Sequence, residues 1–409
     1  MTTARITGSG NLLERVRRGN LGRVLTRVHE DGPLSRADLT RATELNRSTV
    51  SALVGELVSR GLVTEGRQAA TGVGRPSPTV TAASSVVALA LNPEVDALTL
   101  AVVGLDGTEH HRVRRVLRTV PTPARAASLT EKMIADLGDV FRGRHVVGLG
   151  VALPGIVRAD DGFVRIAPHL GWRDEPFAQR LADRTGLRVS VGNDADLGAI
   201  SERLAGTARR HRDIAYLNGG ASGIGSGIIV NGEPLRGVSG YAGELGHTRV
   251  QSPGRDCHCG STGCLETVVS QALLLEAAGP PQNHRGTTPL DQLAAALAAP
   301  SPRLAAEVEN QLRHLATALR SVIVTVNPGM IVLGGFLGSL RDHTGTRLMD
   351  LVAAETVPVL MEDVVITTAR LGPSSLVRGA AELAFRPLLR DPITHLDAMR
   401  AGRPPSSRR

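Results

Sequence analysis

Cysteine, lysine and aromatic residues are scarce in this chain of 409 residues. It contains three cysteines, and Phe, Trp and Tyr together make up 2% of the sequence. Cysteines gathered in one place, rather than scattered in pairs, are typical of a reducing compartment. No apolar run approaches the roughly 18 residues of a membrane-spanning helix, and the N-terminus lacks the basic, apolar and small-residue sections of a signal peptide. We therefore expect a cytoplasmic protein without a membrane partner.

The net charge of +8 is unevenly distributed. Residues 1–80 carry 12 arginines and 7 acidic residues, and residues 400–409 carry 4 arginines and no acid, whereas residues 81–399 are close to neutral. A basic N-terminal segment on a near-neutral body is typical of a protein that contacts nucleic acid through that segment. On charge alone, an arginine-rich surface without this role is the alternative. Lys132 is the only lysine, so the abundance of arginine also fits the composition of the genome.

The three cysteines lie within eight residues of one another, and a histidine precedes them by ten. One imidazole and three thiolates form a complete tetrahedral ligand set for a structural zinc ion, with no position left for water. The alternative is three idle thiols, but thiols placed at random rarely fall so close together. We predict a structural Zn²⁺ held by His247, Cys257, Cys259 and Cys264, in a loop that is fixed onto a larger domain.

The first 82 residues contain three helical patterns followed by two short strand-like segments. Asn20 is a typical N-cap, and the apolar residues after it recur at helical spacing until Asp31-Gly32-Pro33 stops the helix, so we predict a first helix that begins at Asn20. Ser35 and Asn46 are typical N-caps for the next two helices, a short one ending at Ala42 and then a longer one. A short helix, a tight turn and a longer helix form the helix-turn-helix arrangement, whose second helix enters the major groove of DNA.

The first turn of the longer helix carries short polar side chains and one long cation, which suit phosphates and base edges. Residues 62–65 and 77–81 are strand-like and are joined by a glycine-rich link, which predicts the hairpin of a winged domain. We predict DNA contacts through Asn46, Arg47, Ser48, Thr49 and Ser51 of the helix and through Arg67 and Arg75 of the wing. An ordinary helical bundle is the alternative, because its helices also begin with polar turns.

From residue 83 onward, buried strand patterns alternate with helical ones, which predicts an α/β domain. The predicted strands are Val86–Leu91, Leu98–Val103, Val146–Val151, Val189–Val191, Ile214–Leu217, Ile228–Val230 and Ile331–Leu333. The predicted helices are Ala126–Phe141, Phe177–Thr185, Leu273–Ala278, Pro289–Ala298, Leu304–Val326 and Ser375–Leu389. Residues 400–409 are predicted to be a disordered basic tail.

Polar residues stand at predicted strand ends and around the cysteines. They are Asn193, Asp194, Glu244, His247 and Glu266. Open α/β sheets bind ligands at their strand ends. Carboxylates accept hydrogen bonds from adjacent hydroxyls and an amide also donates, so this set suits a polyhydroxylated molecule. For any one of these residues, a helix cap or a surface loop is the alternative. The glycine-rich stretch 219–227 also follows a strand, although glycines mark many tight turns.

Together these motifs resemble the ROK family (repressors, open reading frames and kinases), and in particular its transcriptional regulators. The resemblance rests on residues 223–227, Gly237, residues 243–247 and 257–266, with support from 151–155, 169–172, 192–195 and 327–329. It implies an N-terminal winged helix-turn-helix domain over 1–82 and a two-lobed, actin-like body over 83–399 with a structural zinc loop. It also implies that Asn193, Asp194, Glu244, His247 and Glu266 contact a sugar, with His247 serving the zinc as well.

Kinases of this family need a glycine-rich Asp-x-Gly-Gly-Thr turn after the first strand, and an aspartate that matches Asp194 as the base. The resemblance places Asn92–Asp96 at that turn, where the glycines are replaced and Glu94 would repel a triphosphate. A second phosphate loop is also altered and reads Gly219–Ser222. We therefore expect a sensor and not an enzyme.

The expected function is a sugar-responsive repressor of carbohydrate uptake or catabolism genes. Its expected partners are double-stranded operator DNA, a sugar or sugar-phosphate effector, and further copies of itself in a homodimer or homotetramer. A ROK-type sugar kinase that phosphorylates a hexose with ATP and carries an accessory DNA-binding head is a second hypothesis, supported by Asp194. A third is a zinc-stabilised interaction protein with no small ligand.

Overall fold

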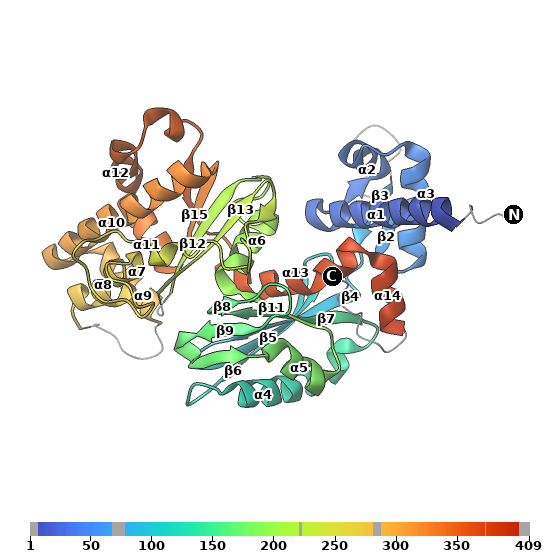
Figure 1. The fold of residues 1–409 in the computed structure, drawn as a ribbon, viewed down its shortest axis with the longest axis horizontal. Helices are drawn as coiled ribbons and strands as arrows, with labels where there is room; N and C mark the ends of the chain where they lie inside the picture. The colour runs from blue at the N-terminus through green and yellow to red at the C-terminus, as the bar shows by residue number, and fades with distance from the viewer. Residues whose placement is uncertain (1–6, 68–77, 221–222, 281–287, 373, 401–409) are drawn as a thin grey trace, which may run out of the picture. The chain divides into compact units, whose positions relative to one another are not determined.

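The computed structural model describes residues 7–67, 78–220, 223–280, 288–372 and 374–400. It divides into two compact units (Figure 1). Unit 1 comprises residues 1–151, 176–191 and 380–409, and unit 2 comprises residues 152–175 and 192–379. Each unit is therefore assembled from separate stretches of chain. Within the described residues, no helix combines the length and the hydrophobicity needed to cross a membrane.

The N-terminal part of unit 1 folds as the predicted winged helix-turn-helix domain. Its elements are α1 (Thr7–Asp31), β1 (Leu34–Ser35), α2 (Arg36–Thr43), α3 (Arg47–Ser59), β2 (Val63–Arg67) and β3 (Pro78–Ala82). The strands form an antiparallel sheet in the order β1-β3-β2. The apolar residues in the second half of α1 are buried, and α1 packs on α2 and α3; these residues are Leu21, Val24, Leu25 and Val28. The link predicted between the two wing strands, residues 68–77, lies outside the described residues.

The two predicted N-caps are confirmed. The Ser35 hydroxyl accepts a hydrogen bond from the Asp38 N–H at 3.1 Å, and the Asp38 carboxylate accepts one from the Ser35 N–H at 3.1 Å. The side chain of Asn46 accepts a hydrogen bond from the N–H of Thr49 at 2.8 Å. Between α2 and α3, Glu44 adopts the left-handed conformation with φ of 56°. That conformation costs about 1 kcal/mol without glycine, so the turn keeps its geometry at a small cost in stability.

The predicted start of the first helix is wrong. Helix α1 begins at Thr7, and Asn20 lies inside it. Glu14 forms ion pairs with Arg17 at 3.4 Å and with Arg18 at 3.1 Å, one turn further along the helix. Pairs at this spacing stabilise an exposed helix. An asparagine favours a helix start but does not prevent a helix from running through it, so the cap signal at residue 20 is overridden.

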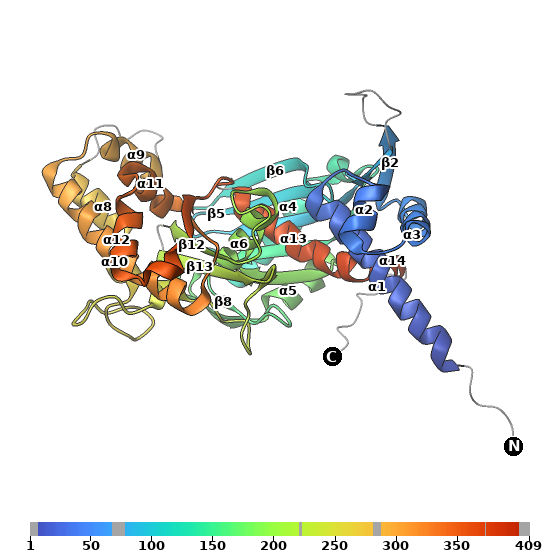
Figure 2. The ribbon, with the colours of Figure 1, turned by 90° about the horizontal axis from the view of Figure 1, so that it is seen from above.

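The rest of unit 1 is built on a five-stranded sheet in the order β11-β7-β4-β5-β6. The strands are β4 (Val86–Pro93), β5 (Ala97–Gly104), β6 (Glu109–Val116), β7 (His145–Leu153) and β11 (Val189–Asn193). The helices are α4 (Pro123–Ala135), α5 (Phe177–Thr185), α13 (Ser374–Arg390) and α14 (Pro392–Arg400). Helices α4 and α5 pack against each other (Figure 1), and α14 packs against α1 (Figure 2). The first residues of α13 and the last of β7 and β11 belong to unit 2.

Two predictions for this region need correction. The helix predicted over Ala126–Phe141 ends at Ala135, and Gly138–Phe141 form a separate 3₁₀ turn, because glycine disfavours a continuing helix. Strand β6 was not predicted, because its sequence EHHRVRRV is that of a polar edge strand with little apolar signal. The other predicted strands and helices are present, with ends shifted by a few residues.

Unit 2 contains a second five-stranded sheet in the order β14-β13-β12-β15-β16. Its strands are β12 (Ile214–Gly220), β13 (Gly223–Val230), β14 (Glu233–Pro234), β15 (Met330–Gly334) and β16 (Val365–Thr368). A small sheet joins β8 (Ile156–Val157), β9 (Val164–Ala167) and β10 (Trp172–Glu175). The helices are α6 (Asp194–Ala205), α7 (Leu265–Val268), α8 (Gln271–Ala278), α9 (Pro289–Ala298), α10 (Pro302–Val326), α11 (Gly335–Thr344) and α12 (Arg347–Glu355).

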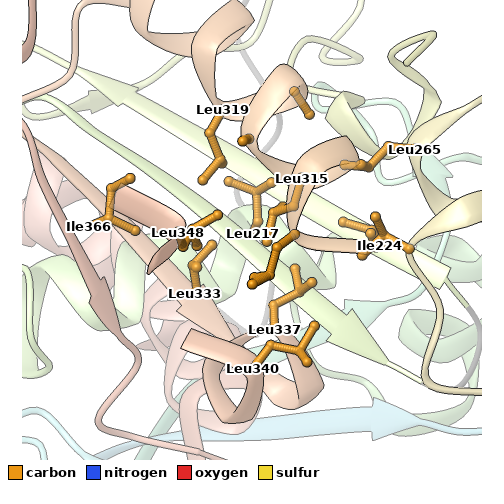
Figure 3. Close-up of a cluster of buried hydrophobic side chains, with 14 of the residues drawn as sticks. Leu217, Ile224, Leu265, Leu315, Leu319, Leu333, Leu337, Leu340, Leu348 and Ile366 are labelled. Atoms are coloured by element: carbon orange, nitrogen blue, oxygen red, sulfur yellow. The ribbon is translucent and has the colours of Figure 1, made fainter. Parts of the chain in front are cut away.

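One face of this sheet packs against helices in a leucine-rich core (Figure 3). Leu217 of β12 and Leu333 of β15 meet Leu315 of α10 there, and all three are fully buried. Burial of one such side chain contributes about 2 kcal/mol. Ile224 of β13 and Leu265 of α7 extend the cluster toward the cysteine region. The core therefore fixes α7, which carries Glu266.

The glycine-rich stretch forms two paired strands and not a loop before a helix. A Cβ on Gly225 would lie 2.9 Å from the Cβ of Ala195, and one on Gly227 would lie 2.8 Å from the Cα of Asp196. Both approaches are closer than ordinary contacts, so a larger residue at either position pushes α6 away. These glycines let the first turn of α6 lie directly on β13. Ala221 and Ser222 lie outside the described residues.

Candidate functional site

The four predicted metal ligands come together in unit 2. Their ligand atoms all lie within 4.8 Å of one another. The Sγ of Cys257 is 3.6 Å from Nδ1 of His247, and the Sγ atoms of Cys259 and Cys264 are 3.7 Å apart. Zinc–sulfur bonds of about 2.3 Å in a tetrahedron place neighbouring sulfurs roughly 3.8 Å apart, whereas a disulfide bond is about 2.05 Å long. The cluster therefore fits a four-coordinate metal ion.

Short-range backbone contacts shape the loop around this cluster. The N–H of Cys257 donates to the carbonyl of Ser261 at 2.8 Å, and the N–H of Gly260 donates to the carbonyl of Cys257 at 3.0 Å. Gly263 has a φ of 73°, and a Cβ there would overlap the carbonyl of Gln251. The loop thus requires glycine at this position in order to bring the cysteines to one point.

Glu266 connects the cluster to the rest of the site. Its Oε1 lies 3.1 Å from the Sγ of Cys257, 3.4 Å from Nδ1 of His247 and 3.1 Å from Nδ1 of His258. The side chain is only 10% exposed. A carboxylate that contacts metal ligands is oriented by them, so an ion in the cluster would also fix Glu266. His258 was not among the predicted site residues, and its position between two cysteines was the available signal.

The other predicted residues lie at the start of α6. The side-chain oxygen of Asn193 accepts hydrogen bonds from the N–H groups of Ala195 at 2.8 Å and Asp196 at 3.0 Å. Its amide nitrogen donates to the carbonyl of Gly155 at 3.0 Å. Asn193 is therefore the N-cap of α6, which leaves one amide hydrogen for a ligand. Asp194 follows as the first residue of the helix.

The carboxylates of the site influence one another. Burial raises the pKa of Asp194 to about 6; backbone N–H donors oppose this shift and the charge of Glu244 adds to it. Glu244 is exposed, but the protein around it displaces water and raises its pKa, with His247 opposing the shift and Glu266 adding to it. The start of α6, residue 244 and the cysteine region thus carry interacting charges, as expected of residues that share one site.

Asp196 is a candidate site residue that the sequence analysis missed. Burial, together with the charges of Glu244 and Asp194, raises its pKa to about 7, while Arg236 opposes the shift. Perturbed carboxylates of this kind gather at functional sites. The available signal was the spacing Asp-Ala-Asp at residues 194–196.

A cavity of about 220 Å³ adjoins Glu266 in unit 2. It is lined by Gly220, Gly223, Asp256, Cys257, His258, Glu266, Thr267, Val269, Ser270 and Phe336. Asn193, Asp194 and Glu244 are not part of its lining. Among the residues predicted to bind sugar, Glu266 therefore both interacts with Glu244 and lines this cavity.

The predicted DNA-contacting residues lie around the first turn of α3. Arg47 and Ser48 are exposed, and among the described residues Arg47 has no hydrogen-bond or ion-pair partner. Ser48 donates to the Asn46 side chain at 2.8 Å, so both belong to the helix cap. Thr49 and Ser51 are half-buried, and Ser51 accepts a hydrogen bond from Arg36 at 3.2 Å.

The wing residues are only partly placed by the structure. Arg67 ends β2, whereas its side chain and Arg75 lie outside the described part of the chain. Of the three arginines predicted to contact DNA, Arg47 is the one whose side chain is described. Its exposure supports a DNA contact.

Family models match both parts of the chain. The ROK family model matches residues 90–386. The chain belongs to the ROK family. A MarR family model matches residues 22–72, within the winged helix-turn-helix domain of this ROK protein.

Individual relatives include regulators and a kinase. The chain is 26% identical to the xylose repressor of Bacillus spizizenii over 385 residues, which cover 91% of this chain and 97% of the relative. It is 32% identical to a glucokinase of Halalkalibacterium halodurans over 276 residues, covering 63% of this chain and 83% of the kinase. A crystal structure of a ROK family transcriptional regulator, a homologue of the E. coli MLC protein, superposes with a TM-score of 0.77 at 25% identity and covers 95% of this chain and 99% of the regulator.

In this ROK protein, the turn expected to hold phosphate in a kinase is a tight β4–β5 hairpin. The N–H of Glu94 donates to the carbonyl of Ala97 at 2.8 Å. Arg114 donates to the carboxylates of Glu94 at 3.3 Å and Asp96 at 3.2 Å. In the described structure, Arg114 is the only positive side chain that pairs with these two acids, and this pairing occupies it. The backbone N–H of Glu94 is likewise used by the hairpin, so neither group is left to hold a phosphate.

Proposed function

We propose that this ROK protein is a sugar-responsive DNA-binding transcriptional regulator that represses genes of carbohydrate uptake or catabolism. The observation that carries the proposal is the combination, in one chain, of a MarR-type winged helix-turn-helix domain and a ROK body. The xylose repressor matches along nearly the full length of both chains, so its match includes both parts. The glucokinase match is confined to 63% of this chain.

The proposed effector site is the set of interacting acidic residues of unit 2, namely Asp194, Asp196, Glu244 and Glu266. Asp194, Glu244 and Glu266 accept hydrogen bonds from the hydroxyls of a sugar or a sugar phosphate, and Asn193 donates its remaining amide hydrogen. His247 binds the metal through Nδ1, so its opposite ring edge is left for the sugar. Asp196 joins this set because its charge is coupled to Asp194 and Glu244.

The cysteine cluster is proposed to bind one structural Zn²⁺ through His247, Cys257, Cys259 and Cys264. The ligand spacing supports this assignment, since it matches the edges of a zinc tetrahedron. When bound, the ion supplies rigidity and takes no part in a reaction, because four protein ligands leave no open position. Its role is to hold Glu266, which lies against two of its ligands.

The winged domain is proposed to place α3 in the major groove of operator DNA. Arg47 contacts phosphate or a base edge from the first turn of α3, supported by Asn46, Ser48, Thr49 and Ser51. Further contacts come from the wing, through Arg67 and Arg75. A homodimer or homotetramer presents two such domains to a roughly palindromic operator in the cytoplasm. The effector releases DNA because it binds the DNA-free arrangement more tightly than the DNA-bound one.

A ROK sugar kinase is the second candidate, because Asp194 matches the family's catalytic base and a glucokinase is among the relatives. The hairpin at residues 92–96 opposes it, because two acids stand where a kinase holds a triphosphate. We therefore propose that the protein has no enzymatic activity.

Binding and turnover measurements on the full-length protein separate these candidates. Operator fragments are first selected from genomic DNA by the protein itself. Release of those fragments is then followed by fluorescence anisotropy with D-xylose, D-glucose, N-acetyl-D-glucosamine and their phosphates. We expect at least one compound to weaken DNA binding tenfold or more, and none to stimulate ATP hydrolysis. Sugar-dependent ATP turnover without any effect on DNA would establish the kinase instead.

A further inference from the structure

The chain passes from unit 2 to unit 1 inside helix α13, between Gly379 and Ala380. Helix α13 contains Pro387 near its C-terminal end, where a helix hydrogen bond is missing. The part before this proline, which includes Gly379 and Glu382, is an uninterrupted helix and therefore moves as one piece. What each end of α13 contacts within its own unit is therefore informative about the response of the protein to a ligand.

In unit 2, the start of α13 is tied to α6, the helix that begins at Asn193 and Asp194. A Cβ on Gly379 would overlap the carbonyl of Leu197, which lies one turn into α6. Glu202 of α6 is fully buried, and its carboxylate accepts hydrogen bonds from the N–H groups of Leu371 at 2.9 Å and Arg370 at 3.3 Å. A displacement of α6 is therefore expected to move residues 370–371 and the first turns of α13 with it.

In unit 1, the second half of α13 is tied to α1 of the winged domain. Nε2 of His29 lies 2.6 Å from the Glu382 carboxylate, and Nδ1 of His29 lies 2.6 Å from the carbonyl of Leu105. The two side chains are only 4% and 9% exposed, and the imidazole packs edge-on against Phe385 at 5.7 Å between ring centroids. Two turns earlier in α1, a Cβ on Gly22 would lie 2.7 Å from the carbonyl of Leu389.

The contacts of His29 define its charge. Both ring nitrogens face oxygen atoms that accept hydrogen bonds, so both must donate, which requires the imidazolium form. Burial alone would lower the pKa of His29, but the Glu382 carboxylate and the Leu105 carbonyl raise it to about 9. The result is a buried, directional ion pair, and such a pair is sensitive to small displacements of either partner.

We propose that α13 transmits occupancy of the effector site to the winged domain, and that His29 and Glu382 are the positioning residues through which α1 follows α13. This inference rests on the proposed function. Glu382 lies three residues beyond Gly379, about 4.5 Å along the helix axis. Helix α1 in turn packs on the recognition helix α3. Effector binding at the start of α6 shifts α13, and the His29–Glu382 pair passes the shift to α1.

The test compares His29→Gln and Glu382→Gln with Glu131→Gln in the full-length protein. Glu131 forms an exposed ion pair with Arg184 in the same unit, so its variant is a control for the loss of one charged pair. The measured quantity is the ratio of the DNA dissociation constants with and without the effector, using whichever of the six sugars and sugar phosphates above releases the wild-type protein. Binding of that compound itself is measured by titration calorimetry.

We expect both junction variants to lose at least tenfold of the effector ratio while their affinity for the compound changes less than threefold. A purely structural role would lower the melting temperature and leave the ratio unchanged, and that outcome would overturn the inference. A wild-type protein whose DNA binding responds to none of the compounds would instead overturn the proposed function, and the inference with it.

Hydrogen exchange of the wild-type protein decides the matter even where a variant fails to fold. On addition of the releasing compound, amide exchange is expected to change by twofold or more in residues 380–390 of α13 and in residues 26–31 of α1. Changes confined to the surroundings of Asp194 and Glu266 would contradict transmission through α13.

Discussion

At the scale of single residues, Asp194 is subject to two opposing requirements, the stability of the folded protein and the binding of a sugar. Its pKa in the folded protein is about 6, against an ordinary value of 3.8, mainly because of burial. The folded state therefore binds a proton more tightly than the unfolded chain does, and folding stability falls as the pH rises from about 4 to about 6. The ionised carboxylate is the stronger acceptor of hydrogen bonds from sugar hydroxyls. If Asp194 belongs to the effector site as proposed, the site therefore binds best at a pH where Asp194 destabilises the empty protein.

The first prediction concerns the pH dependence of effector binding. Affinity should rise about tenfold between pH 5 and pH 8, because one pKa unit corresponds to a factor of about ten and Asp194 ionises in this range. Titration calorimetry across this range measures the effect. The Asp194→Asn variant should bind more weakly, with a flatter profile. An affinity of the wild type that does not vary with pH would remove Asp194 from the site.

The second prediction concerns Arg47, which is exposed and without a partner among the described residues. Arg47→Ala should weaken operator binding by about 1–3 kcal/mol, or five- to 150-fold, if the side chain reads a base, and should reduce the salt dependence if it contacts phosphate. Anisotropy at several salt concentrations measures both effects. Arg142→Ala is the matched control, because Arg142 is exposed and its ion-pair partner among the described residues is Asp139, three positions earlier. Equal affinity of Arg47→Ala and the wild type would exclude the contact.

At the scale of elements, α1 contains a matched pair of glycines. A Cβ on Gly19 would have no neighbour within 4 Å, whereas a Cβ on Gly22 would meet the carbonyls of Leu389 and Arg390 at 2.7 and 2.8 Å. Alanine favours a helix over glycine by up to about 1 kcal/mol. We therefore predict that Gly19→Ala stabilises the protein by about 0.5–1 kcal/mol and that Gly22→Ala destabilises it. Urea denaturation of the two variants should move their midpoints in opposite directions; a shared direction would show that α1 does not pack on α13.

The fourth prediction concerns the cysteine loop. The wild-type protein should contain one zinc per chain by atomic emission, and Cys264→Ser should lose most of it, because Cys264 is fully buried within the ligand set. Effector affinity should fall together with the metal content, since Glu266 contacts the same ligands. Ser261→Ala, in the same loop but outside the ligand set, should retain the metal. Full effector binding by the metal-free protein would separate the loop from the effector site.

Elements with strong local signals could be predicted from the sequence. The caps at Ser35 and Asn46, and the helices Phe177–Thr185 and Pro289–Ala298, were predicted at the residues where the structure has them. Helix α6 was not predicted, because Gly198 interrupts its apolar pattern, although Asn193 and the acidic first turn are signals of a helix start. This omission also hid Asp196, since only the helix and the glycines of β13 bring that residue to Glu244.

At the scale of the whole molecule, the cluster of His247 and the three cysteines could be predicted from their spacing, whereas the division into units could not. Local patterns report on neighbours in the sequence, but each unit is assembled from separate stretches of chain. The contact of His29 with Glu382 joins residues that are 353 positions apart. No periodicity links such positions, so the junction could be recognised only in three dimensions.

The late position of α13 has a consequence for synthesis on the ribosome. The winged domain is translated long before the residues of α13 that contact it: Glu382 emerges 353 residues after His29, and Leu389, which approaches Gly22, emerges later still. A polypeptide cut short before residue 380 would lack these contacts with α1. If α13 transmits effector binding as proposed, only chains that extend through this helix can respond to the nutrients present.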